Sequence, residues 1–149
     1  LEEIFNLIKK SKIKIVTLPS TNLYLQGRND EVSPRRGITR VKELLNNNIS
    51  VLLGSDNIRD AFNPFGNANL LQEALIAAHG CHMGNKKYLT ELFKMITIYP
   101  EKNLKFNGDI KKGKKADFIV LNTTKLSKAI IEQTNIFGKC NGKWVNCNN

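Results

Sequence analysis

The sequence of 149 residues predicts an α/β fold with a small β unit near its carboxyl end. Segments whose apolar residues have helical spacing alternate with short apolar runs, which is the order of βα units. Residues 49–53 form a nearly continuous apolar run, typical of a strand buried on both faces of a parallel sheet. Two β-type runs also flank Asn141-Gly142, and this dipeptide is a strong signal for a type I′ hairpin.

The segments expected before residue 107 follow from the spacing of apolar residues and from local polarity. They are a helix over 1–11, a strand over 13–18, a loop over 20–37, a helix over 38–45, a strand over 49–55, a loop over 58–66, a helix that ends at Gly84, and a helix over 87–97. Asn67 or Asn69 is placed to cap the helix that ends at Gly84, and His82 is expected on its inward face. Both loops are long, and long loops inside compact domains are usually functional.

From about residue 107 the pattern becomes β-type. In chain order it comprises a turn-rich lead at 109–115, a strand over 116–121, and hairpin strands at 136–140 and 143–145. We therefore expect two units, an α/β body over 1–106 and a β unit over 107–149.

Composition disfavours several classes of protein. The net charge of +10 favours anionic partners, but the lysines are scattered and the aromatic residues, 7% of the chain, do not interleave with them. A basic nucleic-acid-binding module is therefore a less favoured alternative. No apolar run approaches the roughly 20 residues that span a bilayer, and no signal peptide is expected near Leu1. Cys81, Cys140 and Cys147 form no CxxC pair, which favours a reducing, cytoplasmic setting.

Asp56 is the main candidate for chemistry. It follows an apolar strand, and in an α/β barrel the catalytic groups lie at the carboxyl ends of the strands. A carboxylate there can bind a divalent metal or act as a general base, and an aspartate that only caps the next turn is the open alternative. Asn57, Arg59 and Asp60 form either a hydrogen-bonding rim or ordinary loop polarity.

His79, Cys81 and His82 lie close together in the sequence but are a weak candidate for a metal site. No HExxH motif and no suitably spaced third ligand accompany them, so partly buried imidazoles on a helix are the favoured interpretation. The sequence also lacks a Walker loop, a GxGxxG fingerprint and a GxSxG elbow.

Several blocks of the sequence resemble the carboxyl-terminal portion of bacterial cytosine deaminases, which belong to the metal-dependent amidohydrolase superfamily. The blocks read NLYLQGR at 22–28, PRRGITRVKELL at 34–45, LGSDN at 53–57 and NPFG at 63–66. A further block, GKKADFIVL at 113–121, is similar to the segment with which the superfamily returns to its small β-sandwich.

The resemblance implies a fold and a function. Residues 1–106 would form the last part of a (β/α)8 barrel, with roughly its seventh and eighth strands, and residues 107–149 a β-sandwich segment. The implied reaction is hydrolytic deamination of cytosine or a related cyclic amidine or amide, with one divalent zinc or iron ion. The implied partner is a small nitrogen heterocycle rather than a nucleic acid or a membrane, and a homo-oligomer is compatible with it.

The resemblance also assigns roles to individual residues. Asp56 would bind the metal and transfer the proton of the hydrolytic water, and Gln26 and Arg28 would lie near the barrel mouth. Asn57 and Phe62 stand where cytosine deaminases carry a second Asp and a Trp, which leaves room for related cyclic amides or aminotriazines as substrates.

The family's HxH pair, its later metal-binding His, its acid/base Glu and the His after strand six have no counterpart in this sequence. Because a hydrolytic zinc site needs about three protein ligands, we expect a fragment that is inactive alone. The alternative is a non-catalytic remnant that acts only by association with another chain.

Overall fold

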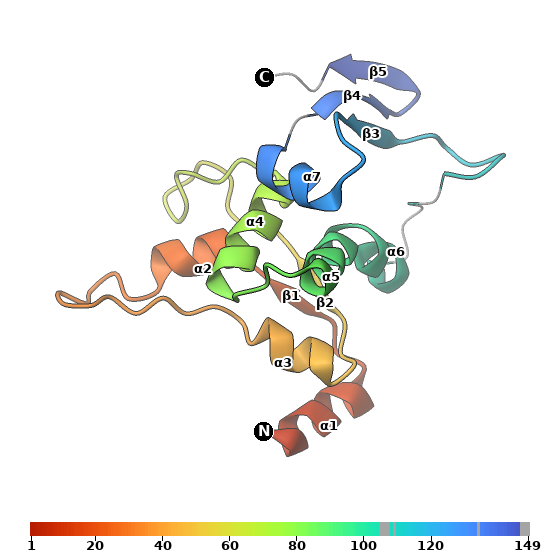
Figure 1. Ribbon diagram of the computed structural model, residues 1–149. Helices are drawn as coiled ribbons and strands as arrows, with labels where there is room; N and C mark the ends of the chain where they lie inside the picture. Colours follow the sequence, from red (N-terminus) through yellow and green to blue (C-terminus); the bar gives the residue numbers. More distant parts are fainter. Residues whose placement is uncertain (105–107, 109, 134, 147–149) are drawn as a thin grey trace.

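The computed structural model describes residues 1–104, 108, 110–133 and 135–146, and the described chain has a mixed α/β structure (Figure 1). A parallel pair of strands, β1 (Ile15–Thr17) and β2 (Val51–Leu53), lies beside the helices α4 (Leu70–Gly80) and α5 (Lys86–Ile96). The remaining elements are α1 (Glu2–Ser11), α2 (Pro19–Leu25), α3 (Val41–Asn46), α6 (Ile98–Leu104), β3 (Phe118–Leu121), α7 (Leu126–Glu132), β4 (Asn135–Cys140) and β5 (Lys143–Asn146). The predicted α/β class is confirmed.

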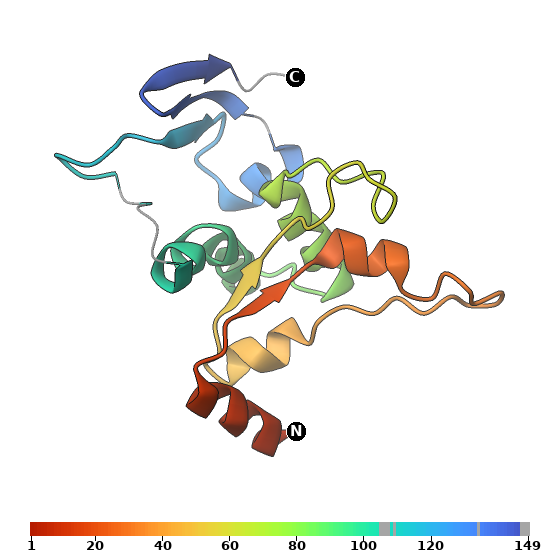
Figure 2. The same cartoon turned by 180° about the vertical axis from the view of Figure 1, so that it is seen from behind.

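The two faces of the β1–β2 sheet have different surroundings. Val51 and Leu53 are buried in the core with the helices, as the alternation of side chains along a strand requires. Val16 and its register partner Leu52 belong to the opposite face, where Val16 is 47% exposed and Leu52 is 2% exposed. Figure 2 shows this side of the sheet, where no helix covers the strands. Because the strands are parallel, their carboxyl ends lie at the same edge, and the chain leaves them there toward α2 and toward Asp56.

The core lies where α4, α5 and α7 meet. Ala74 and Ala77 of α4 are fully buried, and their small side chains allow close helix packing against Leu92 and Met95 of α5. Ile130 of α7 is also fully buried in this cluster, so α7 joins the core of the α/β body.

Two of the helices begin with asparagine caps. The Asn69 side chain accepts hydrogen bonds from the backbone N–H groups of Leu71 and Gln72, at 3.0 and 3.4 Å, which confirms the predicted cap of α4. Asn85 accepts from the Tyr88 N–H at 3.0 Å and caps α5 in the same way.

The carboxyl-terminal strands form a three-stranded antiparallel sheet in the order β3-β4-β5. Asn141 and Gly142 have φ values of 51° and 77°, and positive φ at both central residues is what a type I′ turn requires. The predicted hairpin is therefore confirmed. A β-sandwich stays a prediction, and the expected boundary at 107, Asp109 of the turn-rich lead and Cys147 lie outside the described residues.

Several local predictions were wrong. The loop expected over 20–37 begins as helix α2, which has a proline at its first position, where the missing N–H carries no penalty. Helix α4 ends at Gly80 rather than Gly84, because the Met83 N–H bonds to the Ala78 carbonyl and turns the chain so that the Met83 side chain enters the core. The short helices α6 and α7 were not predicted.

Candidate active site

Asp56 lies just after β2, at the carboxyl end of the parallel strands. Its φ of 57° is in the left-handed region, which aspartate adopts more readily than most residues with a Cβ. The side chain is exposed, and its carboxylate has no hydrogen bond or ion pair within the part of the chain that the structure describes.

Asp60 organises the loop that follows Asp56. Its carboxylate accepts hydrogen bonds from the Asn57 side-chain amide at 2.7 Å and from the backbone N–H groups of Phe62 and Asn63 at 2.9 and 3.0 Å. These donors, the Asn57 amide first, lower the pKa of Asp60 below its usual value. Gly66 closes the loop, because a Cβ there would collide with the Asn57 carbonyl oxygen. Two of the three expected rim residues, Asn57 and Asp60, are therefore hydrogen-bonded to each other, whereas Arg59 is exposed and its place in a rim stays a prediction.

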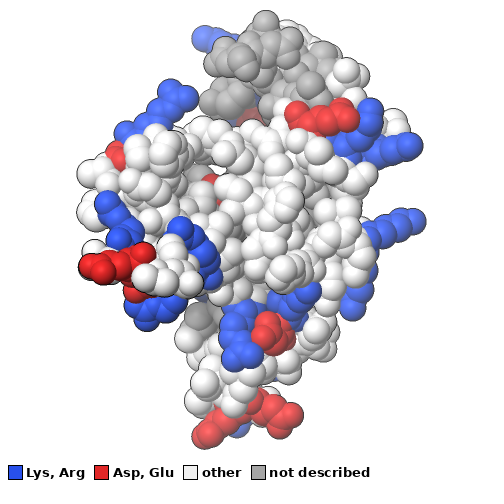
Figure 3. Space-filling view, turned by 60° about the vertical axis from the view of Figure 1, so that its left-hand side comes forward, with Lys and Arg blue, Asp and Glu red and all other residues white. Residues whose placement is uncertain are grey.

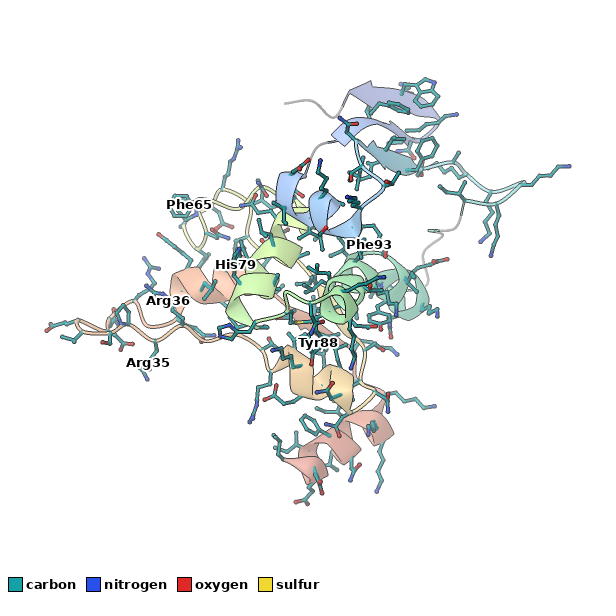
Figure 4. All side chains as sticks on the ribbon, viewed as in Figure 1. Arg35, Arg36, Phe65, His79, Tyr88 and Phe93 are labelled. Atoms are coloured by element: carbon teal, nitrogen blue, oxygen red, sulfur yellow. The ribbon has the colours of Figure 1, made fainter. Side chains whose placement is uncertain are left out.

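Arg28 and Phe62 come together although they are far apart in the sequence. Both line an open cavity of about 680 Å³ between the loop after α2 and the loop after β2. The Arg28 guanidinium lies 5.2 Å from the centre of the Tyr24 ring, and the Tyr24 ring meets the Phe65 ring edge-on at 5.6 Å. Figure 4 shows Phe65 on the loop after β2.

Gln26 lies apart from this cavity. It lines a neighbouring open cavity of about 560 Å³ and is packed against Gly37, where any Cβ would collide with the Gln26 side chain. That second cavity is also lined by Arg35 and Arg36. Figure 4 places both on the segment between α2 and α3, which extends away from the core. Asp56 and Asn57 line neither cavity.

The structure reveals a buried polar cluster that sequence reasoning missed. Glu73 of α4 is 2% exposed, and its carboxylate accepts hydrogen bonds from the Ser20 N–H at 3.0 Å and the Ser20 hydroxyl at 2.6 Å. Burial raises the pKa of Glu73, and the two Ser20 hydrogen bonds oppose that rise. Asn63 and Thr21, 1% and 3% exposed, continue the cluster toward β2. The residues of this cluster are far apart in the sequence, so no local pattern pointed to it.

The histidine region does not form a metal site. His79 and His82 are both exposed, so the expected partly buried imidazoles are wrong. His82 follows the end of α4 with a φ of 52° and therefore leaves the inward face predicted for it, whereas His79 stays on α4 (Figure 4). Among the described residues, no three His, Cys, Asp or Glu side chains are grouped so that they could hold a metal ion.

Charged residues are dispersed over the surface. On the face drawn in Figure 3, Lys and Arg side chains are spread out, and acidic side chains lie among them. Exposed ion pairs such as Lys128–Glu132, 3.4 Å apart, belong to this mixed pattern. The described helices include none that is long and apolar enough to cross a bilayer.

Comparison with known proteins adds a family and several relatives. The family model described as "Amidohydrolase family" matches residues 1–137. N-isopropylammelide isopropyl amidohydrolase of Pseudomonas sp. (strain ADP) is 39% identical over 95 residues, which are 62% of this chain and 24% of that protein. Pterin deaminase of Rhizobium rhizogenes is 37% identical over 81 residues, 52% of this chain and 18% of that protein.

A solved structure resembles nearly the whole chain. The crystal structure of 5-methylcytosine deaminase from Klebsiella pneumoniae, liganded with 5-fluorocytosine, matches with a TM-score of 0.86 and 28% identity. The match covers 99% of this chain and 37% of the solved chain. The chain thus spans about a quarter or less of the curated relatives described above and just over a third of this structure.

Proposed function

Because the chain belongs to the amidohydrolase family, in its cytosine deaminase-like branch, we propose that it is the carboxyl-terminal part of a metal-dependent enzyme that hydrolytically deaminates a small nitrogen heterocycle. The observation that carries the proposal is the position of Asp56, an exposed carboxylate in a left-handed conformation directly after a parallel strand. The likeness to 5-methylcytosine deaminase supports cytosine or a related cyclic amidine or amide as substrate.

The donor chemistry of Asp56 fits a divalent zinc or iron ion as one of its ligands. A carboxylate oxygen is an ordinary ligand of Zn²⁺, and no described residue occupies this one with a hydrogen bond. Because such a site needs about three protein ligands, we assign the others to polypeptide outside these 149 residues. When bound, the ion would lower the pKa of its water toward roughly 7.

The chain's own residues would then act on the proton and the substrate. Asp56 accepts the proton of the attacking water at a carboxylate oxygen. A bond forms between the water oxygen and the ring carbon that bears the exocyclic amine, the carbon–nitrogen bond breaks, and the amine leaves as ammonia with the proton that Asp56 returns.

Three loop residues would position the heterocycle. Phe62, with a side chain 60% exposed, offers a ring face, and Arg28 offers a cationic donor to the same cavity. Asn57 lies outside that cavity, next to Asp56, and offers its amide oxygen, because its nitrogen is held by Asp60. An amide and a phenyl ring at these positions are compatible with neutral cyclic amides and aminotriazines as well as with cytosine. Gln26 lines the neighbouring cavity and is not assigned a contact with the heterocycle.

Replacement of Asp56 by Asn in the full-length protein tests the proposal. The variant keeps the shape of the side chain but cannot accept the proton, so we expect kcat for ammonia release to fall about 10²–10⁴-fold. Glu132→Gln, which removes a remote exposed carboxylate, is the matched control and should keep full activity. Undiminished turnover by Asp56→Asn would remove Asp56 from the mechanism.

A further inference from the structure

We propose that Thr21 and Asn63 are positioning residues that hold Asp56 in its left-handed conformation through the peptide group before it. The inference rests on the proposed role of Asp56 and adds to it the means by which the fold fixes that side chain. Neither residue touches the cavity lined by Arg28 and Phe62.

The contact that carries the inference joins α2 to the end of β2. The Thr21 hydroxyl donates a hydrogen bond to the Ser55 carbonyl oxygen at 3.4 Å. That carbonyl belongs to the same planar peptide group as the Asp56 N–H, so a bond to it restrains rotation about the N–Cα bond of Asp56. The restrained angle is the φ of 57°, in the left-handed region that aspartate adopts more readily than most residues with a Cβ but still at a cost relative to extended or helical backbone.

The direction of this hydrogen bond is set by Asn63. Its side-chain nitrogen donates to the Ser20 hydroxyl and to the Thr21 hydroxyl, each at 3.2 Å, and so uses both of its hydrogens. Each hydroxyl then donates its own hydrogen onward, Ser20 to Glu73 and Thr21 to Ser55. Because Asn63 and Thr21 are buried, water does not compete for these groups.

The same cluster also restrains the chain after Asp56. The Asn63 N–H donates to Asp60, and Asp60 holds Asn57. The residues on both sides of Asp56 are therefore tied to one buried cluster, which Glu73 anchors in α4. Asp56 itself contributes no hydrogen bond from its side chain to the described residues, so its orientation depends on the backbone.

The test compares Thr21→Val with Thr21→Ser and Thr17→Val in the full-length protein. Thr21→Val keeps the side-chain shape but removes the donor, and Thr21→Ser keeps the donor. Thr17 is the matched control, since it is also a buried threonine, but its hydroxyl donates to Thr39 at 2.9 Å and does not lead to Asp56. We measure kcat, KM and the affinity for Zn²⁺ by chelator competition.

Thr21→Val should lower kcat and kcat/KM equally, by about 10- to 100-fold, since a misplaced catalytic group costs this much, and should weaken Zn²⁺ binding. Thr21→Ser should restore both, and Thr17→Val should change neither. If Thr21→Val does not fold, Thr21→Ala against Thr21→Ser gives the same comparison.

The inference is overturned if the Thr21 variants without a hydroxyl match Thr17→Val in kcat and in Zn²⁺ affinity while Asp56→Asn still abolishes turnover. Full activity of Asp56→Asn would instead overturn the proposed function, so the two failures are distinguishable.

Discussion

Two acidic residues near the candidate site have surroundings that shift their pKa values in opposite directions. Glu73 is buried, and desolvation raises its pKa although Ser20 donates two hydrogen bonds to it. Asp60 is exposed, and hydrogen bonds from Asn57, Asn63 and Phe62 lower its pKa. Folding therefore favours the protonated form of the Glu73 carboxyl group and the ionised form of the Asp60 carboxyl group.

The sign of the Glu73 shift predicts a pH dependence. A carboxyl group whose pKa is raised on folding stabilises the folded state most below its unfolded pKa, near 4.5, and this contribution is lost as the pH rises through the folded value. We expect the free energy of unfolding of the wild type to fall relative to that of Glu73→Gln as the pH rises from 4.5 upward. Urea unfolding at a series of pH values measures the difference.

Asp60→Asn provides the opposite control. Because the pKa of Asp60 is lowered on folding, this carboxylate stabilises the folded protein above its unfolded pKa of 3.8. That contribution to the free energy of unfolding is lost as the pH falls further. A difference between wild type and Glu73→Gln that stays constant or grows with pH would contradict the assignment for Glu73.

At the scale of elements, the cap of α4 gives a direct prediction. Asn69→Ala removes the acceptor for the Leu71 and Gln72 N–H groups and should lower the free energy of unfolding by about 1 kcal/mol. Asn69→Asp keeps the acceptor for the cap but loses the hydrogen bond that the Asn69 amide donates to Gln133, after α7, at 2.9 Å. Comparing the two variants therefore distinguishes the stabilisation by the cap from that by the hydrogen bond to Gln133. Equal losses for both variants in urea unfolding would show that the hydrogen bond to Gln133, and not the cap, stabilises α4.

The clearest predictions from the sequence fall on elements with a distinct apolar pattern. Helices α4 and α5, with 11 residues each, carried clear apolar spacing, and β2 carried a continuous apolar run. Helices α2, α6 and α7 have 7 residues each, fewer than two turns. Such short helices depend on tertiary contacts, as in α2, whose first turn is bonded to Glu73 from 53 residues further along the chain.

The candidate site also contains residues whose positions were predictable from the sequence and residues whose positions were not. Asp56 was predictable because a strand end marks a local position, and the cavity residue Phe62 came from a resemblance of adjacent blocks. The cluster of Ser20, Asn63 and Glu73 was not predictable, because its members are 43 and 53 residues apart and none has an unusual neighbour in the sequence.

For the whole molecule, the partly exposed face of the β1–β2 sheet predicts association. Val16 on this face is 47% exposed although its neighbour Leu52 is buried, and Phe65 on the loop after β2 is 73% exposed. Large exposed apolar side chains next to unpaired strand edges promote contact between chains. We therefore expect the isolated 149-residue chain to elute in gel filtration as a concentration-dependent oligomer, and Val16→Lys to reduce this association. A stable monomer at all concentrations would contradict the interpretation of the chain as part of a larger barrel.

We propose that Asp56 holds a catalytic metal ion together with ligands from the rest of a barrel. Anomalous scattering from crystals of the full-length protein loaded with Zn²⁺ measures this directly. We expect an ion about 2.0–2.2 Å from a carboxylate oxygen of Asp56. An ion bound by the barrel with the Asp56 carboxylate outside coordination distance would contradict it.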